Sequence, residues 1–272
     1  MNRMNRFLAL LSTLLAVFPA NAATTLKAGG LSEFNVELPR ELRQIAGRGQ
    51  LSPVAHALVT VAVPAGFDAA RGYPVMIISA TSDPQYHSSR GLLGAYAEAA
   101  LAGEWVLVAA DPAEEVSVER DDVGLRYALN AAALAALASQ WPAAGNAPLA
   151  FGGFSGGAKY SGWLATAFAR QGRSIIGIYL AGINSDTIVP AARHFNVLNE
   201  TFSRVPIFLQ SADDDEIATP VDHQGVRDNL QRAGFKHVRL EQAGGSHRVD
   251  PGPLRAALDW FRELAAHPVG GR

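Results

Sequence analysis

One serine in this chain has almost no side chains around it. The segment "GGFSGG" (152–157) places Ser155 among four glycines, and residues 153–157 fit the pattern G-x-S-x-G. An apolar, strand-like run precedes the serine, and a segment with a helical pattern follows it. At a sharp strand-to-helix turn a serine hydroxyl is exposed, and the strained backbone leaves little room for neighbouring side chains. The pattern therefore indicates a nucleophilic serine.

The helix that is expected after this serine contributes a second chemical group. The first N–H groups of a helix have no acceptor within it, and the helix dipole favours negative charge at that end. We therefore predict that the backbone N–H of Gly156 points at the oxyanion formed when Ser155 attacks a carbonyl carbon.

A serine nucleophile needs a base to take its proton and an acid to orient that base. With this type of turn, the acid and then the histidine follow successive late strands. The apolar segment 205–212 is followed by "DDDEIATP", and the segment 236–243 is followed by "GGSHRVDP". His247, in a glycine-lined loop before the last helix, is the predicted base. The candidates for the acid are Asp213, Asp214, Asp215 and, after an earlier strand, Asp186.

The remaining histidines fit the role of base less well. His223 lies within a predicted helix and His237 at the start of a predicted strand, so both are expected at the solvated surface. His194 lies on a helix, and His87 lies in the loop after the second strand.

Apolar runs alternate with helical patterns over most of the chain. The predicted strands are 55–63, 73–80, 105–112, 147–155, 174–182, 205–212 and 236–243. The predicted helices are 92–103, 122–139, 158–172, 187–203, 221–234 and 252–266.

From Trp105 onward the predicted strands are near-continuous apolar runs, which is typical of parallel strands covered by helices on both faces. The sequence therefore predicts an α/β fold with a doubly wound, mostly parallel sheet flanked by helices. Residues 23 to about 50 show a weaker pattern, and a hairpin or arm is expected there.

The N-terminal residues have the layout of a secretory signal peptide. Residues 1–22 contain two arginines, an apolar run from Phe7 to Phe18 and the small-residue segment "ANA". The run is too short for a membrane-spanning helix, which needs about 20 residues. We expect cleavage after Ala22, no stable membrane anchor, export to the periplasm or the medium, and a single domain over 23–272.

The composition argues against several classes of function. The 272 residues include no cysteine, so we expect neither disulfides nor a thiol nucleophile. The net charge of −2 gives no reason to expect nucleic acid or an anionic membrane as a partner. The histidines lack metal-ligand spacing and the acidic turn lacks the EF-hand pattern, so no metal site is predicted.

These motifs together resemble the α/β-hydrolase superfamily, specifically its compact esterase-like members, the dienelactone-hydrolase-like and polyhydroxyalkanoate-depolymerase-like proteins. The resemblance covers about residues 55–266 and rests on the turn at 153–157, the acid segment 211–220 and the His247 loop. It implies hydrolysis of a small-molecule or polymeric carboxylic ester through an acyl-enzyme, without a cofactor.

The resemblance also bears on which acid is used. Family members often have a small turn residue, an Asp three residues later and a Pro soon after. Asp215 has this position if Ala212 is the turn residue, and Asp214 has it if Ser211 is. The apolar residue and the proline that follow favour Asp215.

A second oxyanion donor is expected in the loop after the strand at 73–80. Family members commonly have His-Gly there, whereas this chain has "ATSDP" (80–84). Because a backbone N–H needs no particular side chain, Thr81 or Ser82 can donate, and Thr81 is our prediction. Three residues of the following segment are candidates for lining the substrate pocket, namely Tyr86, His87 and Arg90.

Two other functions stay open at this point. A serine peptidase of the same fold would use the same three side chains on an amide, and a non-catalytic binding protein would keep the fold without turnover. Residues 183–204 are too few for a separate cap domain. We therefore expect a shallow pocket near Tyr86, Asn184 and His247, and a preference for short acyl chains.

Overall fold

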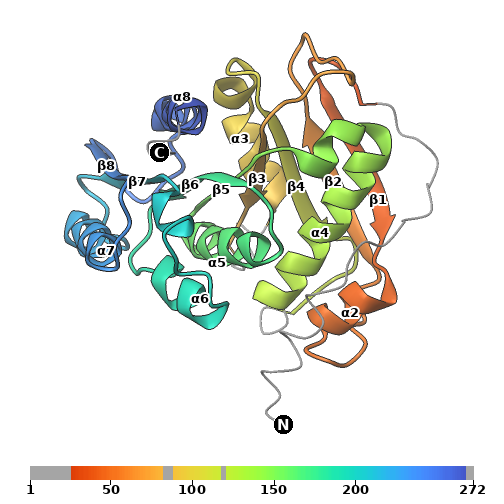
Figure 1. Cartoon of the computed structure of the whole chain (residues 1–272), viewed down its shortest axis with the longest axis horizontal. Helices are drawn as coiled ribbons and strands as arrows, with labels where there is room; N and C mark the ends of the chain where they lie inside the picture. Colours follow the sequence, from red (N-terminus) through yellow and green to blue (C-terminus); the bar gives the residue numbers. More distant parts are fainter. Residues whose placement is uncertain (1–25, 82–87, 118–120, 268–272) are drawn as a thin grey trace.

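The computed structural model describes residues 26–81, 88–117 and 121–267. The predicted signal peptide, residues 1–22, lies outside the described residues. The described residues form one eight-stranded sheet in the order β1-β2-β4-β3-β5-β6-β7-β8 (Figure 1). The strands are β1 (Leu31–Glu37), β2 (His56–Ala62), β3 (Val75–Ser79), β4 (Val106–Pro112), β5 (Leu149–Phe154), β6 (Ile175–Ala181), β7 (Ile207–Ala212) and β8 (Val238–Ala243).

Helices cover both faces of this sheet (Figure 1). The α-helices are α2 (Arg40–Ala46), α3 (Ser89–Leu101), α4 (Val123–Gln140), α5 (Gly156–Arg170), α6 (Ile188–His194), α7 (Pro220–Arg232) and α8 (Gly252–Ala266). The 3₁₀ helices are η2 (Pro142–Asn146) and η3 (Phe202–Arg204). One core lies between the sheet and helices α2, α4, α5, α6 and α7, and the other lies between the sheet and helices α3 and α8.

The strands from β4 to β8 in the sheet order are all parallel, whereas β1 and β2 are antiparallel to their neighbours. All five residues of β3 and the first five of β4 are buried, as expected for strands covered on both faces. The predicted doubly wound, mostly parallel sheet is confirmed. Because the carboxyl ends of parallel strands meet at one edge of a sheet, the loops after β3, β4, β5, β7 and β8 lie along the same edge.

The region before residue 56 is more regular than the sequence indicates. It forms β1 and α2, and β1 pairs with β2 over its whole length, from Leu31 opposite Ala62 to Glu37 opposite His56. Helix α2 packs against α4 and buries Leu42 and Ile45. The expected hairpin or arm is therefore an antiparallel pair whose two strands are joined through a helix.

The connection between β6 and β7 is less helical than predicted. Helix α6 ends at His194, whereas the sequence predicts a helix over 187–203. Asn196 has φ = +54° and the Val197 N–H bonds to the carbonyl of Ala192, a geometry that closes a helix C-terminus. Pro190 is tolerated because N–H groups in a first turn have no acceptor within the helix. With only α6 and η3 between β6 and β7, this connection builds no separate cap domain.

Within the described part of the chain, no helix combines the length and the apolar character that a membrane span requires.

Candidate active site

Ser155 lies between the last residue of β5 and the first residue of α5. Its dihedral angles are φ = 55° and ψ = −120°, a region that residues with a side chain rarely adopt. The turn is held from the neighbouring strand, because the Ser155 N–H donates to the carbonyl of Ala181 at 2.8 Å. The strain keeps the hydroxyl at the carboxyl edge of the sheet.

The glycines around Ser155 are required by close backbone contacts. A Cβ atom at Gly153 would lie 2.6 Å from the carbonyl oxygen of Ser79 on β3. A Cβ atom at Gly157 would overlap the same oxygen and lie 2.9 Å from the carbonyl carbon of Ala80. The end of β3 therefore passes directly against the start of α5, and side chains at these two positions would push the elements apart.

The structure brings Ser155, His247 and Asp215 together in one hydrogen-bonded chain. His247 Nε2 lies 3.0 Å from Ser155 Oγ, and His247 Nδ1 lies 2.8 Å from Asp215 Oδ2. The three residues follow β5, β7 and β8, so the topology of the sheet alone places them at one edge. The Asp215 side chain is 2 % exposed and that of His247 is 15 % exposed.

Hydrogen bonds stabilise the ionised form of the Asp215 carboxylate. Its Oδ1 atom accepts the backbone N–H groups of Ile217 at 2.9 Å and Ala218 at 2.7 Å. Burial raises the pKa of Asp215, but the hydrogen bonds from the Ala218 N–H, from His247 and from the Ile217 N–H together hold this pKa below its usual value. A buried carboxylate of this kind can fix the ring orientation of His247 and stabilise its protonated form.

The other three candidate acids make different contacts. Asp213 is exposed and accepts a bond from Gln242, and Asp214 is exposed with its N–H bonded to Gly245. Asp186 accepts the N–H groups of residues 188 and 189 at the start of α6 and also contacts Asn229.

Phe154 and Gly182 shape the surroundings of His247. The rings of Phe154 and His247 lie 4.7 Å apart between centroids. Gly182 has φ = +59°, and a Cβ atom there would lie 2.8 Å from the Phe154 ring and 3.2 Å from His247 Cε1. Glycine therefore allows the two rings to pack beside the turn. The sequence carries a weak signal for this pair, since Phe154 occupies a variable position of the motif.

Thr81 and Gly156 lie side by side. A Cβ atom at Gly156 would lie 2.9 Å from Thr81 Cβ and would overlap its hydroxyl oxygen. Gly156 is the first residue of α5, so its N–H has no acceptor within the helix. The two residues predicted to supply the oxyanion donors are therefore neighbours, although they come from different parts of the chain. Ser82, the alternative donor, is outside the described residues.

Comparison with known proteins identifies the fold. No protein-family model matches the chain, and no curated protein matches it in sequence. A serine hydrolase without a lid from Xanthomonas campestris superposes with a TM-score of 0.57 at 17 % identity, over 89 % of this chain and 98 % of that one. An esterase from Pyrobaculum calidifontis superposes with a TM-score of 0.57 at 12 % identity, over 98 % of this chain and 92 % of that one. The chain has the α/β-hydrolase fold.

A peptidase shares this α/β-hydrolase fold as well. A putative dipeptidyl aminopeptidase IV from Bacteroides ovatus superposes with a TM-score of 0.56 at 12 % identity, over 88 % of this chain and 35 % of that one. The resemblance to the α/β-hydrolase superfamily is thus confirmed at the level of the fold, which hosts hydrolysis of more than one kind of bond.

The structure corrects the prediction for His223. This residue is fully buried, whereas the sequence indicates a solvated position. Its Nδ1–H donates to the carbonyl of Thr219 at 3.0 Å, and its Nε2 accepts the N–H of Ile183 at 3.2 Å. Burial lowers the pKa of His223 more than the Thr219 carbonyl and the nearby carboxylates raise it, so the ring is neutral near pH 7.

His223 therefore connects two loops of the α/β-hydrolase fold. It shares the buried face of α7 with Val226 and Leu230, a helical spacing that is visible in the sequence. Its ring joins the turn after β6 to the end of the Asp215 loop. The polar type of His223 hid this position, because histidine is more often found at the surface than those two apolar residues are.

The structure gives a different result for each residue that was predicted to line the substrate pocket. Tyr86 and His87 lie outside the described residues. The guanidinium of Arg90 is directed at Glu33 of β1, with Nε 2.6 Å from the carboxylate, so this side chain does not point toward Ser155. Asn184 is exposed and its side-chain amide donates to the carbonyl of Ile217 at 3.2 Å. It lies on the rim of the Asp215 loop.

Two further histidines considered as the base, His194 and His237, are not part of the hydrogen-bonded chain. His194 is half-buried and packs edge-on against Trp163 and Phe195, and His237 is half-buried just before β8. In residues 26–81, 88–117 and 121–267, no group of three or more histidine or acidic side chains is arranged to hold a metal ion.

Proposed function

We propose that the protein is a serine hydrolase that cleaves carboxylic esters. In this proposal Ser155 is the nucleophile, His247 is the general base and acid, and Asp215 orients the imidazole. The observation that carries the proposal is the unbroken chain of hydrogen bonds from Asp215 through His247 to Ser155, at 2.8 and 3.0 Å. These contacts match the roles of a serine–histidine–carboxylate site.

In the first half of the reaction, His247 Nε2 takes the hydroxyl proton while Ser155 Oγ attacks the carbonyl carbon of the ester. The carbonyl oxygen becomes an oxyanion, which the backbone N–H groups of Gly156 and Thr81 stabilise. His247 then gives its proton to the leaving alcohol as the carbon–oxygen bond breaks. The products of this half are the free alcohol and an acyl group bound to Ser155.

In the second half, a water molecule replaces the alcohol. His247 takes a proton from the water, whose oxygen attacks the acyl carbon, and the second oxyanion occupies the same position. Its collapse releases the carboxylic acid, and the proton returns to Ser155 Oγ. The negative charge on Asp215 favours the protonated imidazole that exists in both halves.

Two observations support an ester rather than an amide as the substrate. The esterase and the lidless serine hydrolase superpose over 92 % and 98 % of their own chains, whereas this chain covers 35 % of the peptidase. An ester is also easier to cleave than an amide, because an alkoxide leaves more readily than an amide anion, and a site without a cap provides less binding energy to assist a poor leaving group. We also propose that residues 1–22 direct export of the protein.

Reaction with a fluorophosphonate probe tests the proposal. We expect the wild-type protein to be labelled at Ser155 and the Ser155→Ala variant to remain unlabelled. A non-catalytic binding protein would give no label at this serine. A matched pair of substrates, a p-nitrophenyl ester and a p-nitroanilide of the same acyl group, then separates the two activities. Faster cleavage of the anilide would show a peptidase-type site and contradict the ester assignment.

A further inference from the structure

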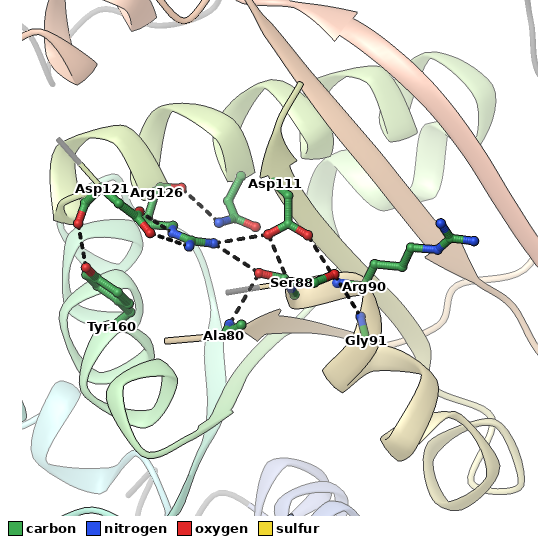
Figure 2. Close-up of polar contacts among 10 residues, drawn as sticks. Ala80, Ser88, Arg90, Gly91, Asp111, Asp121, Arg126 and Tyr160 are labelled. Carbon is green, nitrogen blue, oxygen red and sulfur yellow. Dashed lines mark hydrogen bonds and ion pairs between the residues drawn. The ribbon is translucent and has the colours of Figure 1, made fainter. Parts of the chain in front are cut away.

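Arg126, in the first turn of α4, is buried although it carries a charge. Its side chain is 2 % exposed. A buried arginine is rare unless its guanidinium is paired. Here Nε and Nη2 each lie 2.6 Å from one carboxylate oxygen of Asp121, and Nη1 lies 3.2 Å from Asp111 (Figure 2). The catalytic steps proposed above use none of these three side chains.

The two carboxylates keep this guanidinium charged. Burial lowers the pKa of Arg126, but the hydrogen bond and charge of Asp121 and the charge of Asp111 outweigh it, so the pKa lies above its usual value. The planar guanidinium binds Asp121 through two parallel bonds, an arrangement that fixes its orientation as well as its position. Its remaining nitrogen, Nη1, is therefore held in a defined direction.

That nitrogen is connected by hydrogen bonds to the segment that follows β3 and contains Ala80 and Thr81. Nη1 of Arg126 donates to Ser89 Oγ at 3.1 Å, and the same oxygen accepts the backbone N–H of Ala80 at 3.2 Å. Ser89 is held on its other side, because its own N–H donates to Asp111 at 3.0 Å. Ala80 directly precedes Thr81, so the position of Ser89 fixes the backbone next to the proposed oxyanion donor.

The same cluster is tied to the helix that carries the other donor. The hydroxyl of Tyr160, on α5, donates to the backbone carbonyl of Asp121 at 2.6 Å (Figure 2). The guanidinium of Arg126 also lies 5.6 Å from the centre of the Tyr160 ring. Because Gly156 begins α5, the cluster around Arg126 links both backbone donors, Thr81 through Ala80 and Gly156 through Tyr160.

We propose that Arg126 is a positioning residue for the oxyanion hole, and that Ser89 transmits its effect by holding the N–H of Ala80 and so the direction of the Thr81 N–H. This inference rests on the proposed function. An oxyanion hole accelerates the reaction only when its donors are already placed before charge develops. A small rotation of the peptide between Ala80 and Thr81 would weaken binding of the transition state while leaving the substrate pocket in place.

The test uses the full chain with three variants. Ser89→Ala removes the oxygen that accepts the Ala80 N–H and adds no bulk. Arg126→Lys keeps the charge but cannot bind Asp121 through two bonds and also reach Ser89. Arg48→Met is the control, because Arg48 pairs with Asp122 at the start of the same helix through an exposed bond, apart from the hydrogen bonds that connect Arg126, Ser89 and Ala80. Each variant is compared with the wild type in kcat, KM and affinity for an aliphatic trifluoromethyl ketone, which forms an oxyanion on a serine.

For Ser89→Ala and Arg126→Lys we expect kcat to fall about 10- to 100-fold with KM within about twofold of the wild type. The affinity for the ketone should fall by the same factor as kcat/KM, because both report binding of the oxyanion. The pH at which kcat/KM is half-maximal should not move, because Asp215 and His247 are unchanged. Arg48→Met should behave as the wild type.

A folded Ser89→Ala variant with wild-type kcat and ketone affinity would overturn the inference, and so would an equal loss in Arg48→Met. If Arg126→Lys fails to fold, Ser89→Ala decides alone. The two proposals fail in different ways. A wild-type protein that neither hydrolyses esters nor reacts at Ser155 removes the proposed function and this inference with it, whereas an active wild type with an unaffected Ser89→Ala removes only the inference.

Discussion

The two sides of Ser155 lie at the same edge of the sheet but are held in different ways. On one side, the loops after β7 and β8 carry Asp215 and His247, and Asp215 is fixed by N–H groups two and three residues further along its own loop. On the other side, the end of β3 is fixed by Ser89 and Arg126, which come from α3 and α4. The first side uses local contacts, and the second uses a buried ion cluster assembled from distant parts of the chain.

This difference explains which parts of the site can be predicted from the sequence. A loop that folds on itself leaves a short pattern, so the segment after β7, together with the family resemblance, favours Asp215 among its neighbours. A cluster built from positions 80, 89, 111, 121 and 126 leaves no pattern at any one spacing. The loops after β7 and β8 should therefore respond to single substitutions within them, and the end of β3 to substitutions far away in sequence.

The largest effect is expected at the residue that the two sides share. Ser155→Ala should lower kcat for p-nitrophenyl acetate by about 10⁴- to 10⁶-fold, because the variant has no nucleophile for the acyl-enzyme. The fold should be unchanged, since the Ser155 N–H that bonds to Ala181 is retained. Steady-state kinetics and circular dichroism measure the two effects. A variant with a substantial share of wild-type turnover would show that another group attacks the ester.

A slightly smaller loss of activity is expected for a substitution in the Asp215 loop. Asp215→Asn should lower kcat by about 10⁴-fold, because an amide can leave the imidazole in the wrong tautomer even when its position is kept. Asp213→Asn and Asp214→Asn are matched controls in the same turn, and both should keep activity close to that of the wild type because these side chains are exposed. If Asp214→Asn lost the most activity, the local geometry of this loop would have been misassigned.

The short connection from β6 to β7 should limit the size of the acyl group. Because the connection from β6 to β7 builds no cap, acyl groups longer than about C6 should gain little from each added CH₂, which is worth about 0.8 kcal/mol only when it is buried. A series of p-nitrophenyl esters measures this as kcat/KM against chain length, and we expect a maximum at about C2 to C6. A steady rise to palmitate with a jump above the micellar concentration would contradict an open site.

The smallest expected effect is on the thermal stability of the protein, through His223 at the end of the Asp215 loop. The pKa of His223 is lowered by burial, so the folded protein binds fewer protons than the unfolded chain as the pH falls below the unfolded value of about 6.5. The stabilisation from the neutral ring is thus complete above this pH and is lost below it. The midpoint temperature of thermal unfolding should therefore decrease as the pH is lowered from about 7 to about 5.

His223→Gln sharpens this prediction, because glutamine can accept the Ile183 N–H without titrating. Its unfolding midpoint should depend less on pH over the same range than that of the wild type. His267→Gln, at an exposed position after α8, is the control and should follow the wild-type curve. Equal pH dependence in all three proteins would show that His223 is not the group responsible.

Much of the fold follows from local patterns. The last helix begins and ends where the sequence predicts it, at 252–266, and the buried parallel strands are visible as continuous apolar runs. The helix predicted over 187–203 is too long, because Asn196 adopts a left-handed conformation that propensity alone does not reveal. The strand at the edge of the sheet, β1, was less visible because only one of its faces is covered.

In the candidate site, too, some residues can be predicted from the sequence and others cannot. Ser155, Asp215 and His247 follow strands β5, β7 and β8 of the parallel sheet, so chain order and the sheet are enough to bring them to one edge. The sequence gives no signal for Arg126, because its partners are identified only when α3, β4 and α4 are assembled. His223 was misassigned because burial of a polar side chain depends on partners in two other loops.

The central claim is that Ser155, activated by His247, carries the acyl group during turnover. The most direct measurement is mass spectrometry of the protein quenched with acid while it hydrolyses p-nitrophenyl acetate. The account predicts an acetyl group on the peptide that contains Ser155 in the wild type and its absence in Ser155→Ala. If the wild type hydrolysed the ester while Ser155 stayed unmodified and a different residue carried the acetyl group, the result would contradict this claim.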